Sequence, residues 1–273
     1  MIQVEERYIS LLTDFGFKRI FGTALNKDLL ICFLNSLFDG KQVVKDVSYL
    51  NPEHVGDVYT DRKAIFDVYC EGENGEKFIV EMQNAYQTYF KDRSLFYSTF
   101  PIREQAALLN FDMNEEAFEK EKIRHSVQLC DTATHKVFYD KLEFIYVEIA
   151  KFNKSLEELE TLYDKWLYAL KNLYKLTQRP KELCDKVFDR LFEEAEIAKF
   201  TPQELREYEA STIAYRDIKN SVDTAKREGI AEGMEKKSHE IAKKMLTKGM
   251  NEATVMEITG LPAELIQQLK AEM

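Results

Sequence analysis

Two acidic residues stand where apolar residues are expected, in neighbouring strand-like segments of the first third of the chain. Asp67 lies in Ile-Phe-Asp-Val-Tyr (residues 65–69), and Glu81 lies in Phe-Ile-Val-Glu-Met-Gln (residues 78–83). Segments rich in Val, Ile, Phe and Tyr are usually buried strands. A carboxylate on a buried strand is costly unless a partner such as a metal ion compensates its charge. The two acids are therefore candidate metal ligands.

The turn between these segments determines whether the two acids can act together. A three-residue loop at residues 73–75 (Glu-Asn-Gly), with its glycine left-handed, places Asp67 opposite Glu81 and puts Gln83 on the same face. A two-residue type I′ turn at residues 74–75 shifts the register by one, and the two acids then face opposite sides. In that register the segment is a solvated hairpin without a site. The residues alone leave both registers open.

The composition favours a helix-rich protein with a packed core. The chain has 273 residues, 45% of them apolar, with only ten glycines and five prolines, which suits one large domain or two small ones. The net charge of −10 disfavours a general polyanion-binding surface, but it does not exclude a nucleic-acid enzyme with a local basic surface and acids clustered at a metal.

The sequence also predicts a reduced, cytoplasmic protein without a membrane span. No apolar run approaches the ~20 residues of a membrane helix, and the N-terminus lacks the basic start and apolar stretch of a signal peptide. The four cysteines are scattered, without a Cys-x-x-Cys motif, as expected of reduced thiols. The four histidines show no ligand spacing, which argues against a zinc site.

Hydrophobic spacing predicts an α/β arrangement in the N-terminal half, with strands before and after a long helix. The first expected element is a helical segment over 8–38, which starts at a Thr13-Asp14 cap and stops at Asp39-Gly40. A strand over 43–50 and the hairpin strands 63–71 and 77–84 follow. A helix over 87–110, kinked or divided at Pro101, then leads to strands over 125–130 and 142–149. Such a series favours a mixed sheet with a crossover helix.

The C-terminal part is expected to be entirely helical. Ser155 opens a capping-box-like start, residues 181–199 are amphipathic, and Thr201-Pro202 begins a long helix. A long polar helix with spaced apolar residues, as over 203–246, more often mediates packing or homo-oligomerisation than chemistry. The tail, residues 247–273, predicts short helices joined by glycine turns, as in a helix-turn-helix. Its last helix is poor in basic residues, which favours packing or dimerisation over DNA reading.

Several short motifs follow one another between residues 14 and 266. In chain order they are Asp14-Phe15-Gly16-Phe17-Lys18-Arg19-Ile20-Phe21-Gly22, Phe33-Leu34-Asn35, Asp67 followed by Glu81-Met82-Gln83, then Arg93, Tyr97 and Gln105, then Val147-Glu148-Ile149-Ala150-Lys151-Phe152, and finally Thr259-Gly260-Leu261-Pro262-Ala263-Glu264-Leu265-Ile266. This series resembles the PD-(D/E)XK-family transposases, also called the Rpn recombination-promoting nucleases. The broader superfamily has a lysine where Gln83 stands.

The resemblance implies a restriction-endonuclease-like fold, with a mixed β-sheet flanked by helices and an all-helical C-terminal region. It places the nuclease-like core at residues 1–153, a helical region with the long helix at 154–246, and the helix-turn-helix-like tail at 247–273. It also implies a Mg²⁺-dependent DNA endonuclease linked to recombination or mobile elements, in which Mn²⁺ or Ca²⁺ can substitute for Mg²⁺. The alternative is a catalytically silent nuclease fold that binds DNA or a protein partner.

The same resemblance assigns residue roles. Asp67, Glu81 and the backbone carbonyl of Met82 would bind the metal, and Gln83 would orient the attacking water. Asp14 is either a further acid near the metal or only a helix cap paired with Lys18, four residues on. The expected substrate-binding residues are Lys18, Arg93, Tyr97 and Gln105. The last three would share one face of the predicted helix, which either binds the substrate, with Arg93 on a phosphate, or is only a polar strip that anchors the helix to the sheet.

Overall fold

The computed structural model describes residues 6–50, 53–54, 64–65, 67–73, 75–84, 105–113 and 118–271. The chain divides into two compact units, Met1–Ile218 and Lys219–Met273, each described by itself below. Within the described residues, no single helix is long and apolar enough to cross a membrane. Two neighbouring helices near the N-terminus reach that apolar length together, but they bend by 64° at their junction.

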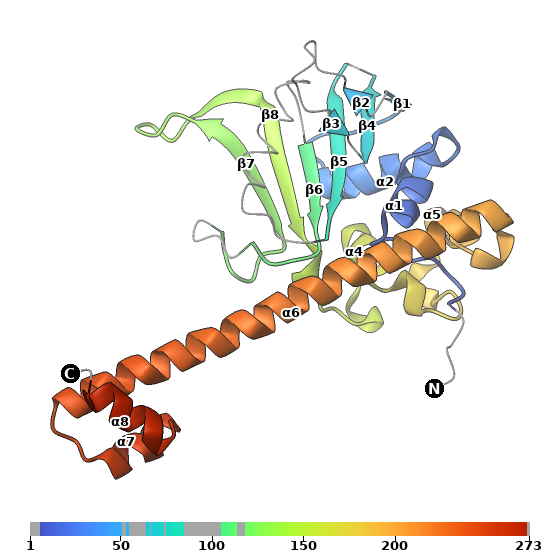
Figure 1. The fold of residues 1–273 in the computed structure, drawn as a ribbon. Helices are drawn as coiled ribbons and strands as arrows, with labels where there is room; N and C mark the ends of the chain where they lie inside the picture. Colours follow the sequence, from blue (N-terminus) through green and yellow to red (C-terminus); the bar gives the residue numbers. More distant parts are fainter. Residues whose placement is uncertain are drawn as a thin grey trace. The chain divides into compact units, whose positions relative to one another are not determined.

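A mixed β-sheet forms the centre of the first unit (Figure 1). Its described strands are β1 (Val47–Tyr49), β4 (Val68–Gly72), β5 (Lys77–Gln83), β6 (Gln105–Leu109), β7 (Arg124–Cys130) and β8 (Val137–Glu148), and they lie in the order β1-β4-β5-β6-β8-β7. Strands β5, β6 and β8 run parallel to one another, and the other pairs are antiparallel. Strands β2 (Glu53–His54) and β3 (Ala64–Ile65) form a separate pair. The predicted mixed α/β sheet is confirmed.

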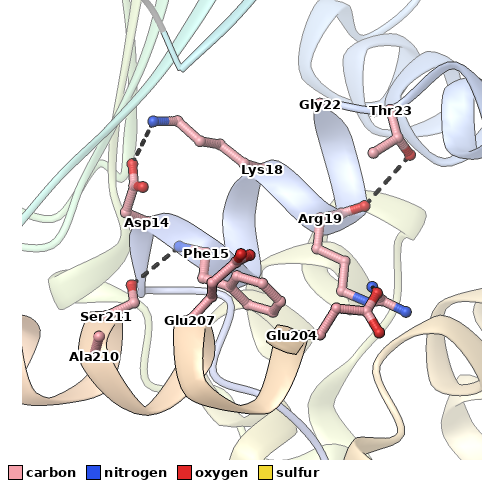
Figure 2. A pocket seen from close by; sticks show the side chains of 10 residues that line it. All are labelled: Asp14, Phe15, Lys18, Arg19, Gly22, Thr23, Glu204, Glu207, Ala210 and Ser211. Atoms are coloured by element: carbon pink, nitrogen blue, oxygen red, sulfur yellow. Dashed lines mark hydrogen bonds and ion pairs between the residues drawn. The ribbon is translucent and has the colours of Figure 1, made fainter. Parts of the chain in front are cut away.

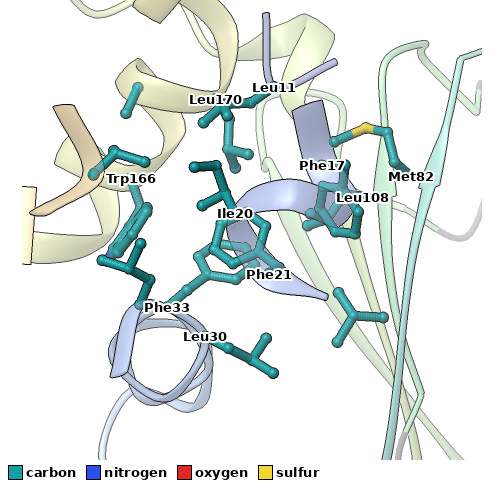
Figure 3. Close-up of a cluster of buried hydrophobic side chains, with 14 of the residues drawn as sticks. Leu11, Phe17, Ile20, Phe21, Leu30, Phe33, Met82, Leu108, Trp166 and Leu170 are labelled. Carbon is teal, nitrogen blue, oxygen red and sulfur yellow. The ribbon is translucent and has the colours of Figure 1, made fainter. Parts of the chain in front are cut away.

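Helices cover one face of this sheet and bury the larger core. They are α1 (Asp14–Phe21), α2 (Lys27–Phe38), α4 (Leu162–Asn172) and α5 (Lys186–Glu194). Figure 3 shows Phe21, Phe33 and Trp166 packed together, and their ring centroids lie 5.1 to 5.7 Å apart. Because side chains alternate along a strand, Val80 and Met82 of β5 face this core, whereas Glu81 and Gln83 face the opposite side of the sheet.

The N-terminal helical segment is divided rather than continuous. Thr13 caps α1, as predicted, because its hydroxyl accepts the backbone N–H of Gly16 at 3.1 Å. Helix α1 ends at Gly22, and the 3-10 turn η1 (Ala24–Asn26) leads into α2. Helix α2 stops where predicted, at Asp39, whose φ of 51° is left-handed. The predicted strand over 43–50 is shorter, since only β1 pairs with a neighbour.

The predicted helix over 87–110 is wrong at its C-terminal end. Residues 105–109 form strand β6, between β5 and β8 at the centre of the parallel part of the sheet. The Ala-Ala-Leu-Leu sequence has good helix propensity, but a strand buried on both sides reads as a continuous apolar run, and tertiary pairing overrides propensity. Most of the predicted helix, including Pro101, lies outside the described residues.

The chain from residue 155 onward is helical, as predicted. Besides α4 and α5 it contains the 3-10 turns η3 (Leu156–Glu158), η4 (Leu173–Lys175), η5 (Lys181–Leu183) and η6 (Ile197–Lys199), and one further 3-10 turn, η2 (Ile149–Lys151), precedes residue 155. The capping box at Ser155 is present but opens only η3, and the amphipathic stretch 181–199 is helical mainly in α5. The long helix is confirmed as α6 (Pro202–Thr247).

The C-terminal unit has a small core of its own. The end of α6 packs with α7 (Glu252–Thr259) and α8 (Ala263–Ala271) around Ala242, Met245, Val255, Ile266 and Leu269. The boundary between the two compact units falls inside α6, and α4 and α5 belong to the unit that holds the sheet. The predicted division into three parts stays a prediction.

Candidate functional site

The hairpin adopts the register that brings the two acids together. Val68 pairs with Val80 and Cys70 with Phe78, and the same register continued by one residue sets Asp67 opposite Glu81. A three-residue loop produces this register: Gly72 N–H donates to the Glu76 carbonyl at 2.8 Å, and the last loop residue, Gly75, is left-handed with φ of 81°. The first of the two predicted registers is therefore the observed one. Asn74, within the loop, lies outside the described residues.

Glu81 and Gln83 share one face of β5, as the period of two requires. The Gln83 amide Nε2 donates to Glu81 Oε2 at 3.3 Å. Glu81 is only 3% exposed, which is uncommon for a glutamate unless a partner compensates its charge. Two carboxylates on one face of a mostly buried hairpin need compensation by a cation or by hydrogen bonds.

Asp67 lies directly before β4, and two groups contact its carboxylate. The backbone N–H of Met82 donates to Oδ2 at 2.8 Å, and the Lys18 ammonium is 3.7 Å from Oδ1. The Asp67 side chain is 22% exposed. Burial raises the pKa of Asp67 above its ordinary value, and the Met82 hydrogen bond and the charge of Lys18 only partly oppose this.

The backbone direction at Met82 follows from the hydrogen bond of the next residue. The Gln83 carbonyl accepts the N–H of Asn110 at 2.9 Å and so points toward β6. Neighbouring residues of a strand point their backbone groups to opposite sides, so the Met82 carbonyl points toward the side of β4, where Asp67 lies.

These oxygens fit a hard divalent cation. The donor set is two carboxylates, from Asp67 and Glu81, and one backbone carbonyl, which are the ligand types that Mg²⁺ and Ca²⁺ prefer. Among the residues that the structure describes, no three His, Cys, Asp or Glu side chains gather in a metal-binding group. Water would therefore complete the coordination shell, as is usual for Mg²⁺.

Asp14 and Lys18 form an i,i+4 ion pair on α1. The Lys18 ammonium lies 2.7 Å from Asp14 Oδ1, and the Asp14 side chain is 64% exposed. Burial lowers the pKa of Lys18, but hydrogen bonds and charge from Asp14 and Asp67 outweigh burial and raise it overall. The helix-cap function belongs to Thr13, while Asp14 interacts with Lys18.

The remaining substrate-binding predictions have different outcomes. Gln105 begins β6 and pairs with Ile79 of β5 and Phe144 of β8, so the helical face that it was expected to share does not exist at this position. Arg93 and Tyr97 lie outside the described residues.

A second polar cluster was not predicted from the sequence. Glu148, at the end of β8, is fully buried; its carboxylate accepts the Met113 N–H at 2.6 Å and contacts Lys151 at 2.7 Å and His125 at 3.0 Å. Leu109 pairs with both Gln83 and Glu148, so these two side chains lie on one sheet face, about 10 Å apart from the usual strand spacing. The sequence feature that could have indicated this cluster is Glu148 at the end of an apolar strand, followed three residues later by Lys151.

The C-terminal unit has the geometry of a helix-turn-helix. The Asn251 side chain caps α7 by accepting the Thr254 N–H at 2.9 Å, and Gly260 ends α7 in a left-handed conformation. Helix α8 exposes Gln267 and Gln268, while its Lys270 contacts Glu252 of α7 at 2.6 Å.

Comparisons with known protein families agree with this arrangement. Residues 11–225 match the PD-(D/E)XK nuclease family transposase description, and residues 235–271 match the Rpn/YhgA-like nuclease family, C-terminal HTH domain. No curated protein and no solved structure gave a significant match. Nucleases with this motif generally use divalent metals, and a nuclease joined to a helix-turn-helix domain implies DNA as the partner. Because the first match covers most of the sequence, the chain belongs to the PD-(D/E)XK nuclease transposase family.

Proposed function

We propose that the protein is a metal-dependent DNA endonuclease that hydrolyses phosphodiester bonds at the Asp67–Glu81 face. The observation that supports this proposal is the hairpin register, in which Val68 pairs with Val80; continued by one residue, it would set Asp67 opposite Glu81, to which Gln83 donates a hydrogen bond. The family membership supports a nuclease function. The family's name also links the activity to recombination or mobile elements.

In this proposal Asp67, Glu81 and the Met82 carbonyl hold Mg²⁺, for which Mn²⁺ or Ca²⁺ can substitute. When bound, the ion supplies positive charge that stabilises the phosphoryl oxygens and lowers the pKa of water. Gln83 orients the attacking water through its amide, which is neutral and can act as neither base nor cation. The low exposure of Glu81 strengthens the electrostatic interactions at this face.

The hypothesis is tested by DNA cleavage with Mg²⁺, with and without a chelator. We expect Asp67→Asn and Glu81→Gln each to lower the cleavage rate by at least about a hundredfold, because loss of metal charge stabilisation costs several kcal/mol. Glu71→Gln is the matched control, since Glu71 lies on the adjoining strand β4 but pairs with Lys77 near the turn. Wild-type cleavage that persists in Asp67→Asn would refute the site.

A second candidate function is a nuclease fold that binds DNA without cutting it. The helix-turn-helix match favours DNA binding by the C-terminal unit independently of the hairpin. Mg²⁺-independent DNA binding by a wild-type protein that shows no cleavage would favour this function. Homo-oligomerisation through residues 203–246 is a separate proposal, supported by exposed apolar side chains at Ile213, Ile218, Val222, Ile230 and Met234.

A further inference from the structure

The Lys18 ammonium lies between two carboxylates of different exposure. It contacts Asp14, which is largely exposed, at 2.7 Å, and Asp67, which is mostly buried, at 3.7 Å. Lys18 itself is 41% exposed. The ammonium therefore lies on the solvent side of Asp67, where a substrate that approaches the site from outside can reach it.

Helix α1 holds this lysine in place. The opposite face of α1 carries Phe17, Ile20 and Phe21, all fully buried in the core. Arg19 fixes the same helix from another side, because its guanidinium pairs with Glu204, donates to the Glu194 carbonyl at 3.1 Å and stacks over the Phe200 ring at 4.3 Å. The position of Lys18 thus follows from a packed helix and is not a chance contact between flexible surface residues.

A groove beside α1 includes Lys18 in its wall. The groove, about 660 Å³, lies between α1 and the first turns of α6, and its charged lining residues are Asp14, Lys18, Arg19, Glu204 and Glu207. Figure 2 shows the Lys18 side chain extending over Asp14 and away from Glu204 and Glu207. Of the two described cations that line this groove, Arg19 is paired with Glu204, whereas the Lys18 ammonium lies 2.7 Å from Asp14 and 3.7 Å from Asp67 and so connects the groove with the Asp67 side of the hairpin.

Among the described residues of the hairpin, the cation Lys77 lies at the turn end and pairs with Glu71, away from Asp67 and Glu81. A phosphodiester carries a negative charge, and Asp67 and Glu81 repel it, while Gln83 is neutral. We propose that Lys18 binds the phosphate on which the site acts, and that Asp14 is a positioning residue for Lys18 rather than a metal ligand. This inference rests on the proposed function and adds to it a residue from a different element.

DNA binding tests the phosphate contact independently of cleavage. With a chelator present, so that the duplex stays intact, we expect Lys18→Met to weaken binding of a short duplex about tenfold, and to lower the slope of log Kd against log salt by about one. Lys18→Arg should restore most of both effects, because it keeps the charge. Lys27→Met is the matched control: Lys27 forms an exposed ion pair with Asp46 at the same 2.7 Å distance, and its removal should leave the slope unchanged.

Metal affinity tests the assignment of Asp14. Titration of Mn²⁺, followed by its electron paramagnetic resonance signal, should give the same affinity for Asp14→Asn as for wild type, and equal or tighter binding for Lys18→Met. Tighter binding is expected because the ammonium and the ion compete for Asp67. A tenfold or greater loss of Mn²⁺ affinity in Asp14→Asn would make Asp14 a ligand and overturn its positioning role.

The outcomes separate this inference from the proposed function. If wild type cleaves, Asp67→Asn does not, and Lys18→Met both cleaves and binds DNA like wild type with an unchanged salt slope, only the inference fails. If wild type does not cleave in Mg²⁺ at all, the proposed function fails, and the salt slope still decides whether Lys18 contacts a phosphate.

Discussion

At the scale of single residues, the surroundings of Asp67 shift its pKa in opposite directions, and the net shift sets how the free energy of unfolding depends on pH when no metal is bound. Burial raises the pKa of its carboxyl group, while the Met82 N–H and the Lys18 charge oppose the rise without cancelling it. The folded state therefore binds this proton more tightly than the unfolded state, whose pKa is about 3.9. The stability contributed by the group is complete below that pH and is lost as the pH rises through the raised pKa of the folded protein.

We accordingly expect Asp67→Asn, with a chelator present, to be at least as stable as wild type at neutral pH, because the amide removes the cost of a buried charge and still accepts the Met82 hydrogen bond. The gain should vanish below about pH 4. Urea unfolding followed by the fluorescence of Trp166, the single and buried tryptophan, measures this. A variant less stable than wild type at neutral pH would show that the contact with Lys18 outweighs burial.

Asp46→Asn provides a control of opposite sign. A hydrogen bond from Lys27 lowers the pKa of Asp46, so its contribution to stability is present above the ordinary pKa and is lost as the pH falls through the folded value. This variant should lose stability at neutral pH and should match wild type in acid.

Part of the site could be read from single residues, and part could not. The two acids within apolar segments, and the Glu-Asn-Gly turn with its glycine, were enough to define two registers, and the pairing of Val68 with Val80 identifies the observed one. The contact of Lys18 with Asp67 joins a helix to a segment far away in the sequence. Rules based on residue spacing within one element cannot predict such a contact. The Glu148 cluster also depends on chain segments that only the fold brings together.

At the scale of elements, the position of α1 depends on a close approach at Gly16. A Cβ atom added there would lie 2.1 Å from the backbone carbonyl oxygen of Ser10, which cannot move without displacing the segment before the helix. Only glycine fits, because the clash is with backbone rather than with a flexible side chain. The same approach fixes α1, and hence Lys18, relative to the N-terminal segment.

Gly16→Ala should therefore lower the free energy of unfolding by about 1–3 kcal/mol and reduce cleavage, because α1 must shift. Urea unfolding and the DNA cleavage assay measure the two effects. Gly229→Ala is the control: Gly229 lies inside α6 with no atom within 4 Å of the added Cβ, so alanine should be neutral or stabilise by about 0.5–1 kcal/mol. Equal effects of the two substitutions would contradict the close approach.

Element prediction succeeded where local signals were complete. The Thr13 cap, the Asp39 stop and the Thr201-Pro202 start lie where the sequence placed them, because each depends on residues within one turn. The segment 105–109 was misassigned because its strand state comes from pairing on both sides with β5 and β8. Local propensity contains no information on those partners.

At the scale of the whole molecule, the chain builds two cores of different size. The first unit buries Trp166 and Leu170 between its helices and its sheet, whereas the C-terminal unit buries Ile266 with a few neighbours. The sequence predicted a helix-turn-helix-like tail correctly, but it could not predict that the boundary between units falls inside α6. Helical periodicity continues through such a boundary, because backbone hydrogen bonding within one helix is independent of which core its side chains join.

Separate cores should lose stability separately. We expect Ile266→Ala to destabilise the C-terminal unit by about 2–5 kcal/mol, as for other large-to-small changes at fully buried sites, and to leave the Trp166 fluorescence transition in place. Leu170→Ala, equally buried in the first unit, should move the Trp166 transition by a similar free energy. Urea unfolding recorded by fluorescence and by far-UV circular dichroism distinguishes the two variants, since circular dichroism reports helices of both units. If Ile266→Ala moved the Trp166 transition as far as Leu170→Ala does, the two units would unfold as one cooperative structure.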